Sequence, residues 1–198
     1  MPKKTCLFIV SGPAASGKTT LAENILRLRA LNIHKVLTTT TRPPRTNEVP
    51  GVDYHFMSQE AFQDNIQKGL FYEYAQVHGE HFYGTLQSDI EPHLQKDIDL
   101  LLLIDVQGAK QIFEAASRLP RLSKSLVSIF LMTPSLDTIR DRLQRRASDH
   151  NIQKRLESAQ IELAERSFFK HCIISTSPEA DLEAFIEIYK QEKGIDKL

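Results

Sequence analysis

The sequence has no excess of charge of either sign, because 25 lysine and arginine residues balance 25 aspartate and glutamate residues. This balance argues against broad electrostatic binding to nucleic acid, although a local cluster of arginines can still hold phosphate groups. The sequence also lacks an apolar run as long as a membrane span, and its first residues are too short for a signal peptide. We therefore expect a cytoplasmic protein without nucleic-acid or membrane partners.

Cysteine is scarce, and the two cysteines of the chain are Cys6 and Cys172. Both lie in apolar runs typical of strands, and no Cys/His cluster accompanies them, so no metal framework is indicated. We expect two buried free thiols rather than a disulfide. The chain of 198 residues is 41% hydrophobic and has no repeat or low-complexity tract, which favours one domain around one core with an insertion.

Segment 11–20, SGPAASGKTT, follows an apolar run at residues 6–10 that is typical of a buried strand. Its two glycines, followed by Lys and Thr, fit the phosphate-loop pattern. Gly12 and Gly17 permit torsions and close approaches that a side chain would block, so successive N–H groups can surround phosphate oxygens. The helix expected after Gly17 adds free N-terminal donors and the positive end of its dipole.

We expect this loop to bind the phosphates of ATP, with Lys18 at the β- and γ-phosphates and the Thr19 hydroxyl on Mg²⁺. The alternative is a chance match in an ordinary loop, against which the flanking strand and helix argue. The residues expected to contact ATP are Gly12, Pro13, Ala14, Ala15, Ser16, Gly17, Lys18, Thr19 and Thr20.

A second phosphate site is expected at the prolines of TTTTRPPR. Pro43 and Pro44 stiffen the chain and hold Arg42 and Arg45 apart. Two planar guanidinium groups in such a loop can fork onto one phosphate. The alternative is a solvated basic loop, and the phosphate loop upstream favours the phosphate site.

Residues 33–96 interrupt the alternation of strands and helices, and we expect them to form a small mixed insertion. Ser58 is expected to cap a helix that ends at Gly69. The stretch after it alternates like a strand, which would pair with the next strand through a turn at Gly79.

Residues 100–104 form a continuous apolar run, as in a strand that is buried on both faces. Asp105 follows at the carboxyl end, where open parallel sheets place ligand chemistry. Its carboxylate is expected to hold a Mg²⁺-bound water or to contact a bound base. The competing interpretation is a helix N-cap, because residues 106–117 have a helical pattern.

An arginine-rich pair of helices, joined by a polar loop at 147–151, is expected over residues 135–169. Such a pair suits a mobile lid over ATP, whose arginines would neutralise charge on the transferred phosphoryl group. Because acidic residues alternate with the arginines, a solvated, salt-bridged face is the alternative.

These segments predict an α/β fold. A P-loop parallel-sheet core flanked by helices would carry an inserted small mixed α/β nucleotide-binding region and a helical lid. The expected divisions of this single domain (1–198) are a core at 1–32, 97–139 and 167–198, the insertion at 33–96 and the lid at 140–166.

Six motifs occur in the order seen in guanylate kinases: GPAASGKTT, TTTRPPR, GVDYHF, FYEYAQVHGEHFYGT, IDVQGA and the RLQRRA–KRL pair. The chain resembles that family over about residues 7–169, and the TTRPPR segment together with YEYA and FYG carries the specificity. The resemblance implies an ATP-dependent kinase for GMP, and for dGMP, in purine nucleotide metabolism. It further implies Mg²⁺ as cofactor and a monomer or homodimer.

The resemblance implies three sets of site residues. The set that would bind GMP comprises Thr38, Arg42, Arg45, Tyr54, Glu73, Tyr83, Thr85 and Asp105. The catalytic set comprises Lys18, Arg45, Arg142, Arg146 and Arg155. The metal set comprises Thr19 and, through water, Asp105.

The chemistry of guanine supports the role that the resemblance assigns to Glu73. Guanine presents its N1–H and N2–H₂ donors side by side, and an ionised carboxylate, which only accepts, can take both. Adenine would present a lone pair at N1 instead. A site built for such hydrogen bonds rejects the wrong base more strongly than an apolar pocket does.

The sequence departs from the family pattern at three places. Leu103 stands where many members have a second acidic residue, which puts more weight on Asp105 for ordering Mg²⁺-bound water. The lid loop looks shorter than in some relatives. The strand near Ser175 reads STS where relatives often have Asn and Asp.

The expected reaction is an in-line attack of a GMP phosphate oxygen on the γ-phosphorus of MgATP, without a covalent enzyme intermediate or a general base. The alternative is a non-catalytic guanylate-kinase-like module that binds phosphopeptides. Such scaffolds usually have a degraded phosphate loop, and here Lys18 and Thr19 are both present. A kinase for another phosphorylated acceptor, such as a ribose bisphosphate, is a third hypothesis, and Glu73 argues for a base-bearing acceptor.

Overall fold

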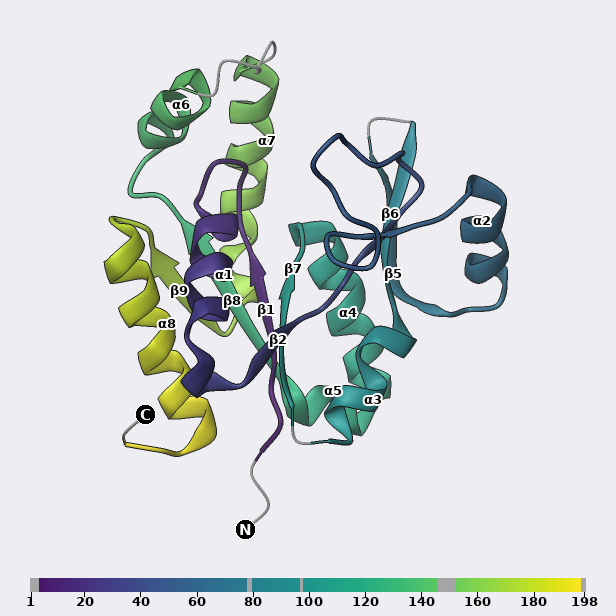
Figure 1. The fold of residues 1–198 in the computed structure, drawn as a ribbon. Coiled ribbons are helices and arrows are strands. Elements are labelled where there is room, and N and C mark those ends of the chain that lie inside the picture. Colours follow the sequence, from purple (N-terminus) through teal and green to yellow (C-terminus); the bar gives the residue numbers. More distant parts are fainter. Residues whose placement is uncertain (1–3, 78–79, 97, 146–151, 197–198) are drawn as a thin grey trace.

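The computed structural model of the protein describes residues 4–77, 80–96, 98–145 and 152–196 (Figure 1). Within these residues a five-stranded sheet, here called the core sheet, has the strand order β2-β7-β1-β8-β9, and all its neighbours are parallel. Its strands are β1 (Leu7–Ser11), β2 (Ile33–Lys35), β7 (Asp99–Leu103), β8 (Leu126–Met132) and β9 (His171–Ile174). This arrangement confirms the predicted α/β fold with a parallel sheet.

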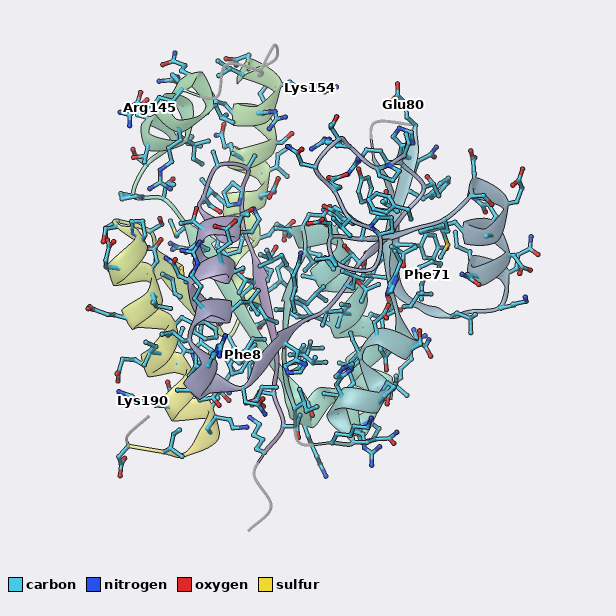
Figure 2. All side chains as sticks on the ribbon, in the orientation of Figure 1. Phe8, Phe71, Glu80, Arg145, Lys154 and Lys190 are labelled. Atoms are coloured by element: carbon cyan, nitrogen blue, oxygen red, sulfur yellow. The ribbon has the colours of Figure 1, made fainter. Side chains whose placement is uncertain are left out.

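Helices cover both faces of the core sheet, which explains why its central strands are apolar without alternation. Phe8 and Val10 of β1 pack in one layer with α1 (Lys18–Arg27) and α8 (Pro178–Lys193). Figure 2 labels Phe8 in this layer. Leu7 and Ile9 point to the opposite face, because successive side chains of a strand alternate.

That opposite face is covered by α3 (Glu91–Leu94), α4 (Val106–Arg118) and α5 (Pro120–Ser125). All four β1 side chains named above are fully buried. Burying one such side chain contributes about 1.5–3 kcal/mol, so β1 anchors the loop that follows it.

A second sheet, here called the insertion sheet, has the order β4-β3-β6-β5 in the described part of the chain. Its strands are β3 (Thr39–Thr40), β4 (His55–Phe56), β5 (Phe71–Val77) and β6 (His81–Leu86). The β5–β6 pair is antiparallel, as predicted, and the turn expected at Gly79 lies outside the described residues.

The helix α2 (Gln59–Gln67) packs on the insertion sheet. The ring of Phe62 stacks on Phe71 with centroids 4.4 Å apart, and Phe71 is labelled in Figure 2. Ser58 caps α2 by accepting the Ala61 N–H at 3.2 Å, as predicted. Gly69 follows the end of the helix with φ of 65°.

The insertion begins later in the chain than the sequence suggested. The strand β2 lies within residues 33–96, but it pairs with β7 in the core sheet, where Ile33 is opposite Asp99. Ile90 and Leu94, near the other end of that segment, are buried in the layer of α4. The backbone N–H and C=O groups of β7 need hydrogen-bond partners on both of its edges. β1 pairs with one edge and β2 with the other, which places β2 in the core sheet.

A glutamine side chain joins the insertion sheet to the core. Gln111 on α4 donates from Nε2 to the Tyr74 carbonyl at 3.0 Å, and its Oε1 accepts the Tyr74 N–H at 3.2 Å. These bonds satisfy backbone groups of β5, which is an edge strand of the insertion sheet. They also hold β5 close to α4, and Glu73, the residue before Tyr74, lies near Gly108 in the first turns of that helix.

Helices α6 (Leu136–Arg145) and α7 (Ile152–Ala164) form the predicted arginine-rich pair. They pack through Ile139, Leu143, Leu156 and Ala159, together with Ala15 of the phosphate loop. Figure 1 shows the pair above the phosphate-loop end of the core sheet, with the insertion sheet on the other side. Arg146 and the expected loop at 147–151 lie outside the described residues.

Both cysteines are free thiols, as predicted, but Cys172 is exposed, so the prediction that it is buried was wrong. It lies on the edge strand β9, where Ile173 is buried while Cys172 and Ile174 are exposed. An apolar run at a sheet edge is therefore covered on one face only. Cys6 is buried, and this burial raises its pKa to about 11.

In the described part of the chain, the helices are too short or too polar to cross a membrane. The remaining short elements are 3-10 turns at Arg29–Leu31, Gln87–Asp89 and Glu165–Phe168.

Candidate functional site

The phosphate loop connects β1 to α1 and requires its two glycines. Gly12 has φ of 140°, and a Cβ at this position would collide with the carbonyl oxygen of Leu131 on β8. Gly17 has φ of 107° and is the N-cap of α1. Only glycine adopts such torsions readily, so the backbone of the loop passes close to the end of β8 and turns directly into the helix.

Lys18 is the first residue of α1, and its ammonium group closes the loop. Its Nζ donates to the carbonyl of Gly12 at 2.6 Å and to that of Pro13 at 2.9 Å. The first N–H groups of α1 have no acceptor within the helix. These cationic and N–H donors favour an anion at the start of α1.

A cavity of about 170 Å³ lies beside this loop, lined by Ala14, Ala15, Gly17, Lys18, Thr19 and Thr20. The Ser16 hydroxyl oxygen is buried and has no hydrogen-bond partner among the described residues. Thr19 is exposed at the cavity wall, where its hydroxyl can reach a ligand. The geometry therefore suits the phosphate groups of a nucleotide, as the sequence predicts.

Arg142 of α6 contacts the phosphate loop. Its Nη1 donates to the carbonyls of Ala15 at 3.2 Å and Ser16 at 3.1 Å. The Ser175 hydroxyl lies 3.4 Å from the same guanidinium and donates to Asp181 at 2.8 Å. Thus Ser175, in the segment that departs from the family pattern, contacts Arg142 of α6.

The helix α7 has two charged residues near Ala159, which packs with Ala15 of the phosphate loop; Arg155 is exposed and Glu162 is half-buried. Ala159 lies in the packed face, and Arg155 and Glu162 are about one turn to either side of it. Burial raises the pKa of Glu162 to about 7, while the charge of Lys18 lowers this pKa and that of Asp105 raises it. No sequence motif marks Glu162, and its spacing of three residues from Ala159 is the one signal that places it near this packed helix face.

A second cavity, of about 240 Å³, lies where the core sheet meets the insertion sheet. Its lining residues come from both parts of the fold, and they are Thr38, Tyr54, Glu73, Ala75, Tyr83, Gly84, Leu103, Ile104 and Asp105. Ligand pockets usually exceed about 300 Å³, so this cavity suits a nucleobase-sized group rather than a whole nucleotide.

Glu73 provides a buried carboxylate at this cavity. Its residue is 5% exposed, and its Oε1 accepts the Thr85 hydroxyl at 2.7 Å, which orients the group. A Cβ on Gly108 would lie 3.0 Å from Glu73 Oε2, so α4 approaches the carboxylate closely. Burial raises the pKa of Glu73 to about 7; the Thr85 hydrogen bond lowers this pKa and the charge of Asp105 raises it.

Asp105 is the N-cap of the next helix, as one of the two interpretations predicted, and it also lines the cavity. Its Oδ1 accepts the Gly108 N–H at 2.8 Å, so it is the N-cap of α4. Its side chain is exposed and also lines the cavity that holds Glu73. Leu103, which stands in place of an acidic residue, forms an apolar part of the same wall.

Aromatic and basic residues lie at another part of the cavity. Tyr54 and Tyr83 line it, and Arg42 donates from Nε to the Tyr83 hydroxyl at 3.2 Å. The Arg42 guanidinium also lies 5.6 Å from the centroid of the Tyr54 ring. Burial and the Tyr83 hydroxyl raise the pKa of Tyr54, while the charges of Arg42 and Arg45 lower it.

A model of the family described as Guanylate kinase matches residues 4–191. The chain belongs to the guanylate kinase family. The guanylate kinase of Wolbachia sp. subsp. Brugia malayi (strain TRS) is 35% identical over 189 residues, which cover 94% of this chain and 93% of that protein. The guanylate kinase of Clostridioides difficile (strain 630) is 36% identical over 194 residues, covering 97% and 90%.

A solved structure of the same family agrees with the fold described above. The crystal structure of guanylate kinase from Anaplasma phagocytophilum superposes with a TM-score of 0.76 at 29% identity, covering 98% of this chain and 88% of that one. Together these similarities confirm the predicted resemblance. The protein is thus a nucleotide-binding kinase of the guanylate kinase family.

The fold brings the predicted site residues of this family member into two neighbouring groups. The phosphate-loop group includes Lys18, Thr19 and Arg142, and the cavity group includes Glu73, Tyr83 and Asp105. The catalytic role predicted for Arg146 concerns a residue outside the described part of the chain. Glu162 has no motif that marks it in the sequence, because the charges that act on it, those of Lys18 and Asp105, are distant along the chain.

Proposed function

We propose that the protein transfers the γ-phosphoryl group of ATP to GMP and to dGMP, giving ADP and the nucleoside diphosphate, in purine nucleotide metabolism. The observation that carries this proposal is the buried Glu73 carboxylate, which Thr85 orients at a base-sized cavity next to an intact phosphate loop. A carboxylate at such a cavity matches the paired donors of guanine and opposes the N1 lone pair of adenine.

On the donor side, the backbone N–H groups at the start of α1 and the Lys18 ammonium would hold the phosphates of ATP. Mg²⁺ bound with ATP would supply charge neutralisation at the phosphate oxygens. Thr19 and, through water, Asp105 are the residues of this chain that would hold it, since hydroxyl and carboxylate oxygens are the ligands that Mg²⁺ prefers. Their exposed positions at the two cavities fit that role.

On the acceptor side, Glu73 would bind guanine, and Thr38 and Asp105 would form the neighbouring walls. The phosphate of GMP would be contacted by Arg42, Arg45, Tyr54 and Tyr83. The phosphate oxygen that attacks is already largely ionised at neutral pH, so the reaction needs positioning and charge neutralisation rather than a general base.

The lid arginines would neutralise charge on the transferred group. Arg142 already contacts the phosphate loop, and Arg155 is an exposed residue of α7 next to Leu156, which packs with Ala15 of that loop. Closure of the lid would exclude water and so suppress hydrolysis of ATP. Arg146 belongs to the same proposal from the family resemblance.

The test is an ADP-release assay with MgATP and a panel of GMP, dGMP, AMP, CMP and UMP. We expect turnover with GMP and dGMP and at most weak turnover with the other nucleotides. The Glu73→Gln variant is expected to use GMP less well and to discriminate less against AMP. A folded wild-type protein that phosphorylates none of the panel would overturn the proposal, and binding of phosphopeptides would then favour the scaffold hypothesis.

A further inference from the structure

Glu48 binds both arginines of the RPPR loop. Its Oε1 accepts from Arg42 Nη2 at 2.8 Å and its Oε2 from Arg42 Nη1 at 2.9 Å, which makes the pair bidentate. The same Oε2 accepts the backbone N–H of Arg45 at 2.8 Å, and the Glu48 N–H donates to the Arg45 carbonyl at 3.0 Å. The side chains of Arg42 and Glu48 are only 12% and 17% exposed, so this is not a solvated surface pair.

These contacts hold the Arg42 guanidinium in one orientation. A guanidinium has five N–H groups. The Nε group donates to the Tyr83 hydroxyl, Nη1 donates to the Pro43 carbonyl and to Glu48, and Nη2 donates to Glu48. Within the described residues four N–H groups are therefore engaged, and one on Nη2 remains.

Arg45 has the opposite arrangement. Its backbone is held by Glu48, while its side chain is exposed. Its charge acts on Tyr54, which lines the cavity. Hydrogen bonds from Arg42 and from the Arg45 N–H hold the pKa of Glu48 below its usual range, so the carboxylate is ionised and cancels one of the two cationic charges.

We propose that Glu48 is a positioning residue for the phosphate of the acceptor nucleotide. It fixes Arg42 beside Tyr83 and Tyr54 and holds the backbone of Arg45, so that both guanidinium groups are placed for the phosphate. This inference rests on the proposed function. Because Glu48 orders the loop before the ligand arrives, phosphate binding does not have to restrict a flexible arginine at that moment.

The opposite role would be that of a placeholder, in which Glu48 occupies Arg42 until a phosphate displaces it. Displacement would break two charge-assisted bonds to Arg42 and one bond to the Arg45 backbone. It would also release the loop that carries Arg45. The arrangement therefore favours a carboxylate that stays in place, and the two roles predict effects of opposite sign.

The test compares Glu48→Gln with Asp53→Asn. Asp53 is a carboxylate near the same loop whose Oδ2 accepts the Val49 N–H at 2.8 Å, so its substitution removes one charge without touching the Arg42 pair.

Calorimetry gives Kd for GMP and for guanosine, and steady-state kinetics give kcat and the KM for GMP. For Glu48→Gln we expect GMP to bind about tenfold more weakly with a matching rise in KM. Guanosine binding and kcat should change less than about threefold, and Asp53→Asn should alter none of these values by more than that.

Several outcomes would overturn the proposal. Tighter binding of GMP by Glu48→Gln would identify a placeholder, and an equal loss of GMP and guanosine would identify a merely structural residue. The effect should also vanish when Glu48→Gln is added to an Arg42→Gln variant, since the two residues act as a unit; full additivity would contradict this. A wild-type chain that binds no GMP would overturn the proposed function together with this inference, whereas normal GMP binding by Glu48→Gln would overturn this inference alone.

Discussion

At the scale of single residues, two glutamates of the insertion have carboxyl groups of opposite character. Glu73 is buried with one hydroxyl partner, Thr85, and its burial raises its pKa to about 7. Glu48 accepts hydrogen bonds from Arg42 and the Arg45 N–H, which hold its pKa below the usual range. Glu73 therefore titrates near neutral pH at the proposed guanine site, whereas Glu48 stays ionised beside Arg42.

The raised pKa of Glu73 predicts a pH dependence of guanine binding. The ionised form accepts both guanine donors, so below pH 7 binding must first remove a proton from the carboxyl group. We expect the affinity for guanosine to fall about tenfold per pH unit below 7 and to level off above it. Guanosine is the probe because it has no phosphate that titrates in this range.

The control for this prediction is Glu73→Gln, whose amide does not titrate. Its guanosine affinity is expected to be weak and flat from pH 5.5 to 8. If calorimetry found the same pH profile in both proteins, another group would be responsible.

Lys18 provides a second prediction at this scale. Its ammonium is expected to contact the transferred phosphate, so Lys18→Ala should lose about 3 kcal/mol or more of transition-state stabilisation while the protein stays folded. The measurement is kcat/KM together with the unfolding midpoint. Lys68→Ala removes a lysine that pairs with Asp64 on the surface and should leave kcat/KM unchanged. Near-wild-type turnover of Lys18→Ala would refute the assignment.

At the scale of elements, the phosphate loop depends on how tightly it passes β8. A methyl group at Gly12 would collide with the Leu131 carbonyl, which belongs to a buried strand and has little room to move. By contrast, a Cβ on Gly69, which has φ of 65° at the end of α2, would meet nothing within 4 Å. An alanine at Gly69 would therefore test the cost of positive φ alone, whereas an alanine at Gly12 would add a collision to that cost.

Gly12→Ala is expected to displace the loop, to abolish ATP binding and to reduce the free energy of unfolding by more than about 2 kcal/mol. Gly69→Ala is expected to reduce it by about 1 kcal/mol, from the positive φ alone, and to bind ATP normally. Calorimetric ATP binding and chemical denaturation test both. Equal losses in the two variants would show that the collision with β8 is relieved without cost.

At the scale of the whole molecule, a buried carboxylate ties the two ends of the chain to the edge strand. Glu192 on α8 accepts Lys4 at 3.0 Å, Lys170 at 2.6 Å and His171 at 2.7 Å, and its side chain is 4% exposed. Burial by itself would raise the pKa of Glu192, but the hydrogen bonds from Lys170, His171 and Lys4 outweigh it and lower the pKa to about 2. The Glu192 carboxylate therefore joins the segment before β1, the start of β9 and the helix α8.

This network predicts a loss of stability in acid. A carboxyl group whose pKa is lower in the folded state contributes stability above its unfolded value, near 4.5, and loses it as pH falls towards 2. The contribution is on the order of 2–3 kcal/mol, and Glu192→Gln should remove most of it at pH 7 and little at pH 2. Denaturation of both proteins across this range measures the difference. Glu187→Gln, at an exposed pair with Lys190, is the control and should show no such convergence.

Features that a few consecutive residues specify could be predicted without the structure. The phosphate loop, the cap at Ser58, the buried runs of β1, β7 and β8, and the position of Asp105 at the end of β7 follow from local torsions, capping and periodicity. The family resemblance assigned Glu73 to the base, and the structure brings it to the cavity with Asp105. These predictions needed no knowledge of which elements become neighbours.

Features that depend on contacts between distant residues required the three-dimensional structure. It placed β2 in the core sheet, left Cys172 exposed at an edge and brought Glu162 within the influence of Lys18 and Asp105. It also paired Glu48 with Arg42 rather than with solvent. A pKa, a burial or a charge pair is set by everything that surrounds a group in three dimensions, whereas a linear pattern records only the neighbours along the chain.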